Sequence, residues 1–92
     1  MKKLLEENKA FIKNNFFVTE LGVFGSFVRG EQEDKSDIDV LVSFKSGHQD
    51  FFNYIRLKYF LEDLLDKEVD LVIKGAVKKR LRQKILSEVE YV

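Results

Sequence analysis

The chain has 92 residues and a mass of 10.8 kDa, and its 16 basic residues balance 16 acidic ones. A chain of this length supports one hydrophobic core, so we expect a single domain over residues 1–92. Hydrophobic residues make up 45% of the composition, which excludes a disordered chain. The lack of cysteine excludes disulfides, thiolate metal sites and cysteine nucleophiles. A metal would need oxygen ligands or the single histidine, His48, which we expect to be exposed to solvent.

The balanced charge argues against direct nucleic-acid binding through bulk charge. Charge is nevertheless unevenly distributed, because residues 74–84 include several Lys and Arg residues and no acid. This run favours a solvated helix face over a phosphate-binding patch, and both alternatives stay open. No segment approaches the roughly 18 apolar residues of a membrane span, and early charges interrupt any signal-peptide core. We therefore expect a cytoplasmic protein.

The first regular pattern along the chain is that of an amphipathic helix. Its apolar side chains recur at helical spacing between Lys and Glu residues, at Leu4, Leu5, Phe11 and Ile12. We expect about three turns, ending at Asn14 and Asn15. The run from Phe16 to Phe24 then predicts a strand that stops at a Gly-Ser pair, and a charged loop follows.

The clearest strand covers residues 37–44, because apolar side chains alternate along one face at Ile38, Val40, Val42 and Phe44. Asp50 can cap a helix that runs to about Asp66. A third strand is predicted at residues 69–73, and a last helix after Gly75 has apolar positions at Val77, Leu81, Ile85 and Val89. This order predicts an α/β (α+β) domain of two layers, with helices packed on a small mixed sheet. The helix ending at Asp66 is apolar on all sides, which predicts a partner or self-association.

Two aspartates stand at the start of the clearest strand. Asp37 and Asp39 are two residues apart, so their side chains leave the same face about 6 to 7 Å apart. Both carboxylates can converge on one hard cation such as Mg²⁺. Acidic residues are common where strands begin, so this pattern alone favours a surface role over a metal site.

A third aspartate, Asp70, lies inside the apolar strand at residues 69–73. One helix connects this strand to the previous one, which fits a parallel crossover that brings Asp70 to the same side as Asp37 and Asp39. An aspartate between two apolar residues is costly to bury without a ligand, which favours a functional role. The alternative is a surface-facing aspartate on an edge strand.

The pair Gly25 and Ser26 ends the first strand. Backbone N–H groups of such a turn, with the Ser26 hydroxyl and no side chain at Gly25, can bind phosphate oxygens. An ordinary turn with a serine cap would give the same sequence. If the first two strands are antiparallel, this pair faces Asp37 and Asp39. A phosphate cradle opposite three carboxylates is suited to phosphoryl or nucleotidyl transfer with two metals.

These motifs resemble one family over nearly the whole chain. The stretch from Gly25 to Gly30, the segment Ser36-Asp37-Ile38-Asp39 and the later Val69-Asp70-Leu71-Val72 are similar to the signature of the DNA polymerase β nucleotidyltransferase superfamily. Within it, the chain resembles the minimal nucleotidyltransferases. The resemblance implies the nucleotidyltransferase fold and an enzyme that uses two Mg²⁺ ions and ATP.

The resemblance also assigns roles to individual residues. It implies that Asp37, Asp39 and Asp70 are catalytic and hold Mg²⁺, with Asp70 helping to deprotonate the attacking hydroxyl. It implies that Gly25, Ser26 and Arg29 bind the nucleotide; Arg29 could equally hold the turn in place. An acceptor hydroxyl would attack the α-phosphate of ATP, and pyrophosphate would leave.

The family resemblance also implies a partner. Minimal proteins of this kind are typically encoded beside a small helical HEPN toxin, and the chain would be a type VII-like antitoxin that transfers AMP to a tyrosine of that toxin. Two alternatives remain at this stage. The chain could be a binding module that blocks its partner sterically, or a transferase that acts on a small molecule or an RNA end. Nucleotide preference, the number of AMP units and oligomeric state cannot be decided from sequence.

Overall fold

The computed structural model describes residues 2–25 and 37–92. Two helices come first, α1 (Lys2–Glu7) and α2 (Lys9–Phe16). The prediction of one helix ending at Asn14 and Asn15 is therefore wrong in two respects. The helix is interrupted at Asn8, whose side-chain amide competes for the Leu4 carbonyl at 2.9 Å. The second helix continues through both asparagines to Phe16 and ends where Phe17 takes a left-handed backbone with φ 57°.

The sheet has four strands in the order β3-β2-β1-β4. They are β1 (Val18–Phe24), β2 (Ile38–Phe44), β3 (Val69–Ile73) and β4 (Glu90–Tyr91). Strand β2 pairs antiparallel with β1 and parallel with β3, which confirms the predicted mixed sheet. The short strand β4, which pairs with β1, was not predicted because two residues carry no periodic pattern.

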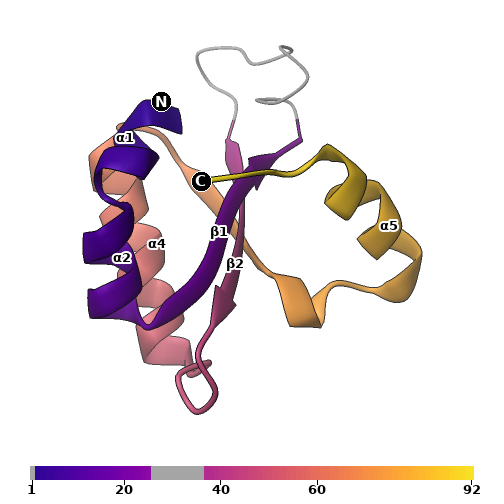
Figure 1. Ribbon diagram of the computed structural model, residues 1–92, viewed down its shortest axis with the longest axis horizontal. Coiled ribbons are helices and arrows are strands. Elements are labelled where there is room, and N and C mark those ends of the chain that lie inside the picture. The colour runs from indigo at the N-terminus through magenta and orange to yellow at the C-terminus, as the bar shows by residue number, and fades with distance from the viewer. Residues whose placement is uncertain (1, 26–36) are drawn as a thin grey trace.

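One face of the sheet is covered by α1, α2 and α4 (Phe51–Leu65), as Figure 1 shows. The alternating apolar residues of β2 point into this layer, where Ile38, Val40 and Val42 are fully buried. Asp50 caps α4 as predicted, because its carboxylate accepts a hydrogen bond from the Asn53 N–H at 2.9 Å. The main hydrophobic core therefore lies between this helix layer and one sheet face.

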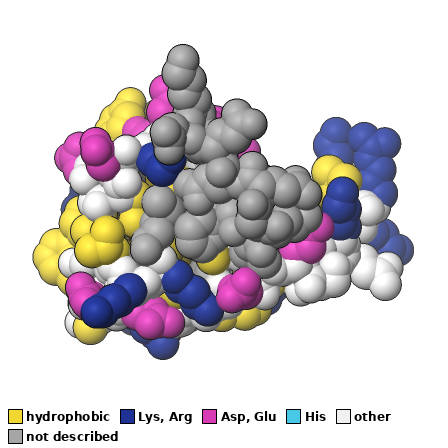
Figure 2. Space-filling model, turned by 90° about the horizontal axis from the view of Figure 1, so that it is seen from above, with side chains coloured by type: hydrophobic (Ala, Val, Ile, Leu, Met, Phe, Trp, Pro, Cys, Tyr) yellow, Lys and Arg dark blue, Asp and Glu magenta, His cyan; other side chains and the backbone are white. Residues whose placement is uncertain are grey.

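The last helix, α5 (Lys79–Glu88), follows a 3-10 turn, η1 (Lys74–Ala76), and lies on the other side of the sheet (Figure 1). It has no buried residue. The four positions predicted as its apolar side are half-buried or exposed, with Leu81 at 46% exposure. Figure 2 shows Lys and Arg side chains gathered at this end of the molecule. The basic run is therefore exposed to solvent on α5, which is compatible both with a solvated face and with an anion-binding patch.

Helix α4 also presents aromatic side chains to solvent. Phe51 and Phe52 are 70% and 78% exposed, as expected for a helix with more apolar surface than the sheet can cover. The expectation for His48 is wrong, because its ring is half-buried and stacked on Phe17 with 3.8 Å between centroids. In the part of the chain that the structure covers, no helix is long and apolar enough to cross a membrane.

Candidate active site

The candidate site lies on the sheet face that points away from α1, α2 and α4, which we call the open face. Side chains alternate along a strand, so Asp39, Leu41 and Ser43 of β2 point to the open face while their neighbours point to the core. The antiparallel register pairs Asp39 with Phe24, the last residue of β1. The turn at Gly25 therefore begins directly beside the predicted metal ligands, as expected.

Strand pairing places two of the three predicted carboxylates side by side. In the parallel register of β2 and β3, Asp39 is the direct partner of Asp70. Paired residues on neighbouring strands lie about 4.8 Å apart and share a face. Asp37 immediately precedes β2 and is exposed, two residues before Asp39. Backbone pairing thus brings the three aspartates to the end of the sheet where β2 and β3 begin, which we call the carboxylate edge.

Asp70 lies on the exposed face of its strand. Its position between Val69 and Leu71 predicted a buried carboxylate, but Asp70 is exposed and β3 is an edge strand. Its apolar neighbours point to the opposite face, where both are buried. Desolvation therefore does not distinguish a functional Asp70 from a surface one. What favours a role is its register against Asp39.

Gly25 is packed tightly against Asp39. Its φ of +75° lies in the left-handed region, and a Cβ at this position would collide with the Asp39 carboxylate. Glycine is therefore required here for two reasons, the backbone conformation and the close approach of a side chain. The sequence predicted space for a phosphate at Gly25; the structure adds that this space is shared with the carboxylate.

The donor set fits a hard divalent cation in its chemistry and strand register. Carboxylate oxygens are the ligands that Mg²⁺ prefers, and the pairing of Asp39 with Asp70 puts two of them on neighbouring strands, with Asp37 two residues before Asp39. Within residues 2–25 and 37–92, however, no three acidic or histidine side chains are gathered closely enough to hold a metal as they stand. Rotation about the aspartate side-chain torsions would have to complete the site. Ser26 and Arg29, the other predicted nucleotide ligands, lie outside the described residues.

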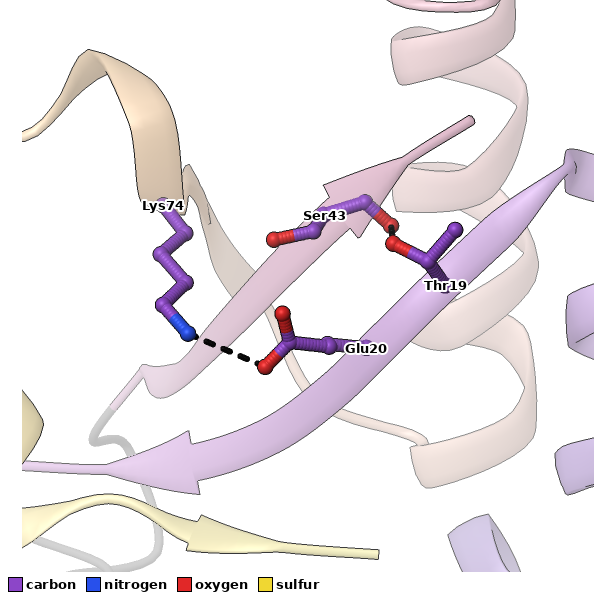
Figure 3. Close-up of polar contacts among 4 residues, drawn as sticks. All are labelled: Thr19, Glu20, Ser43 and Lys74. Carbon is purple, nitrogen blue, oxygen red and sulfur yellow. Dashed lines mark hydrogen bonds and ion pairs between the residues drawn. The ribbon is translucent and has the colours of Figure 1, made fainter. Parts of the chain in front are cut away.

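A second polar group occupies the open face further along the strands. Lys74, directly after β3, donates a hydrogen bond of 3.0 Å to Glu20 on β1 (Figure 3). Its ammonium also lies 5.4 Å from the centre of the Tyr91 ring. Glu20, and then Tyr91, raise the pKa of Lys74 above its usual value of 10.5. This lysine therefore stays charged and ties η1 to β1.

Sequence reasoning missed this group because its members are far apart in the chain. Lys74 belongs to the basic run, whereas Glu20 lies in the first strand and Tyr91 near the end of the chain. The available signal was an acidic residue, Glu20, on the face of β1 that points away from the core. Such a carboxylate is expected to have a cationic neighbour when the end of the chain returns to the sheet and packs beside it. That return is made by β4, which pairs with β1 at Gly22.

Comparison with known proteins places this geometry in a family. The nucleotidyltransferase domain family matches residues 1–92. This chain belongs to that family. It is a minimal nucleotidyltransferase of the DNA polymerase β-like superfamily, as its motifs predict.

Relatives of this minimal nucleotidyltransferase have named activities. The protein adenylyltransferase MntA of Thermococcus cleftensis is 40% identical over 92 residues, covering 100% of this chain and 92% of the relative. A solved "putative minimal nucleotidyltransferase" superposes with a TM-score of 0.81 at 34% identity, over 97% of this chain and 92% of the other. A toxin-antitoxin crystal structure with AMP-PNP has a TM-score of 0.75 at 25% identity, over 94% and 70% of the two chains.

Proposed function

We propose that this minimal nucleotidyltransferase is a Mg²⁺-dependent protein adenylyltransferase that transfers AMP from ATP to a tyrosine of a HEPN toxin, and so acts as an antitoxin. The observation that carries the proposal is the pairing of Asp39 with Asp70 at the edge where β1 ends in Gly25. Its similarity to a protein adenylyltransferase and to a toxin-antitoxin complex supports the substrate and partner.

The chemistry follows from the residues at this edge. The acceptor O–H attacks the α-phosphorus of ATP, the bond from that phosphorus to the bridging oxygen breaks, and pyrophosphate leaves with the bond electrons. Asp70, exposed and next to Asp39, is placed to take the hydroxyl proton. Asp37, Asp39 and Asp70 would hold Mg²⁺, which when bound neutralises charge on the phosphates and favours ionisation of the hydroxyl.

The open face also explains how a protein acceptor can reach these groups. Asp37 and Asp70 are exposed, and Asp39 is half-buried, so no helix of the core layer covers them. A side chain as long as tyrosine can approach such an edge from outside. The Gly25 backbone, with Ser26 after it, would hold the phosphates on the side opposite the acceptor.

The test is transfer of label. The purified chain is incubated with ATP labelled at the α-phosphate, Mg²⁺ and the HEPN protein encoded beside it, and labelled residues are identified by mass spectrometry. We expect AMP on a tyrosine of the HEPN protein, and loss of label with Asp39→Asn. Asp63→Asn is the matched control, because Asp63 is an exposed aspartate on α4.

Other outcomes would identify the alternatives. Inhibition of the HEPN protein without label would make this chain a steric binding module. Label on an RNA end or a small acceptor, with none on protein, would keep the nucleotidyltransferase activity and replace the substrate. Equal transfer by Asp39→Asn and the native chain would contradict the assigned site.

A further inference from the structure

A cavity of about 360 Å³ lies between the sheet and α5, away from the three aspartates. Its wall combines apolar and cationic groups from β2, β3, η1 and α5, including Ser43, Phe44, Ile73, Lys74 and Arg82. Figure 3 shows Ser43 on β2, Glu20 on β1 and Lys74 at the start of η1, with Lys74 directed toward Glu20. Nothing in the proposed transfer reaction uses this cavity.

Strands β2 and β3 carry the aspartates near their starts and lead to the cavity at their other ends, so the two places are a fixed distance apart along the strands. Ser43 is four residues beyond Asp39 on β2, and Lys74 is four residues beyond Asp70. A strand rises about 3.3 Å per residue, so the two places are about 13 Å apart. A protein that presents a hydroxyl to the carboxylates would therefore extend over the cavity as well.

Arg82 gives the cavity its available positive charge. Lys74 is paired with Glu20, whereas Arg82 donates a hydrogen bond of 3.3 Å to the neutral carbonyl of Val77. No acidic side chain is among the described residues that line the cavity. The surrounding helix adds further Lys and Arg residues at this end of the molecule (Figure 2). A ligand with a negative charge is therefore favoured here.

We propose that this cavity binds an acidic side chain of the protein that accepts AMP, with Arg82 pairing with its carboxylate. The inference rests on the proposed function and adds a rule for substrate choice. The acceptor carries a Glu or Asp that reaches the cavity while its hydroxyl reaches the carboxylates, and the cavity wall on the strands lies about 13 Å from Asp39 and Asp70. A planar guanidinium can bind such a carboxylate through two parallel hydrogen bonds.

The lining favours an acidic side chain over a nucleotide or a nucleic acid. Phe44, the aromatic residue of the wall, is only 5% exposed, so it offers no platform on which a base could stack. The apolar part of the wall at Ile73 instead suits the aliphatic stem of a glutamate.

The inference is tested by steady-state transfer to the HEPN protein with substitutions on α5. We expect Arg82→Ala to raise the KM for the protein acceptor about tenfold, while kcat and the KM for ATP stay within about twofold. Arg82→Lys keeps the charge and should recover part of the affinity. Arg80→Ala is the matched control, because Arg80 is also exposed on the same helix but is not among the residues that line the cavity.

A binding measurement separates this inference from the proposed function. The anisotropy of a fluorescein-labelled peptide of eight glutamates should report binding to the native chain, about tenfold weaker binding to Arg82→Ala, and unchanged binding to Arg80→Ala. If the native chain transfers no AMP, the proposed function fails while the peptide still tests the cavity. Equal peptide binding by the native chain and Arg82→Ala overturns the inference. The inference is also overturned if Arg82→Ala raises only the KM for ATP. It is likewise overturned if Arg82→Ala weakens binding of single-stranded RNA and leaves peptide binding unchanged.

Discussion

The two faces of the sheet differ in what covers them and in what they carry. On the covered face, helix side chains such as Leu57 and Leu61 are fully buried against the strands. On the open face, α5 buries none of its residues and the strands carry Asp39, Asp70 and Glu20. The main core therefore stabilises the domain from the covered side, whereas the open face buries Leu41 but also carries charged groups that would be costly to bury.

The comparison separates stability from chemistry. Substitutions on the covered face should change the free energy of unfolding, and substitutions on the open face should change transfer. Gly25 is the exception, because it belongs to the turn where backbone conformation and a carboxylate meet. Four substitutions test this separation.

The largest effect is expected on the open face. Asp39→Asn should lower AMP transfer about 10²–10³-fold, because it removes a carboxylate that would hold the Mg²⁺ needed to neutralise charge on the phosphates. Its free energy of unfolding should stay within about 1 kcal/mol, since the amide has nearly the same shape and the side chain is only half-buried. Labelled transfer and urea denaturation measure the two quantities. A variant that loses several kcal/mol of unfolding free energy but keeps its specific activity would contradict the assignment of stability to the covered face and chemistry to the open face.

On the covered face, Leu57→Ala should destabilise the domain by about 2–5 kcal/mol. Leu57 has 0% exposure and belongs to the main core, so its removal leaves a cavity in addition to the lost burial. Chemical denaturation followed by circular dichroism gives the value. Below the unfolding transition, AMP transfer per folded molecule should be unchanged. A loss under 1 kcal/mol would mean that this face is not the main source of stability.

The turn at Gly25 should respond in both measurements. Gly25→Ala places a Cβ on a residue with φ +75°, which should lower the free energy of unfolding by about 1–2 kcal/mol. The added Cβ should also displace the Asp39 carboxylate. Gly47→Ala is a matched control, because Gly47 has φ +85° but open space where the Cβ would lie. Both variants should lose similar stability, and only Gly25→Ala should lose transfer. Equal transfer by the two variants would show that the contact with Asp39 does not matter.

The smallest effect is expected on α5. Leu81→Ala should change the free energy of unfolding by less than about 0.5 kcal/mol, because Leu81 is 46% exposed and α5 contributes nothing to the core. Thermal or urea unfolding, compared with Leu57→Ala under the same conditions, provides the measurement. A loss near that of Leu57→Ala would mean that α5 packs more tightly than its exposure indicates.

Local pattern predicted most of the fold. The alternation in β2 and the spacing in α4 gave both elements correctly, because each period reports directly which face is buried. The same logic failed for α5. Its apolar residues have helical spacing at Leu81 and Ile85, but spacing does not say whether another element covers them.

The candidate site was predictable in part. Asp37 and Asp39 share a face because of strand geometry alone, and the family resemblance named Asp70 as their companion. The argument from burial of Asp70 was wrong, since exposure depends on strand order in the sheet. Register, which no local pattern fixes across a helical crossover, is what puts Asp70 beside Asp39.

The sequence by itself determined the element types, the three aspartates, the glycine turn and the membership of the nucleotidyltransferase family. Only the tertiary structure decided that Asp39 pairs with Asp70, that Gly25 packs on the Asp39 carboxylate, and that α5 stands apart with Arg82 beside a cavity. Side-chain periodicity is set by bonds between neighbouring residues, whereas these contacts depend on how distant segments pack.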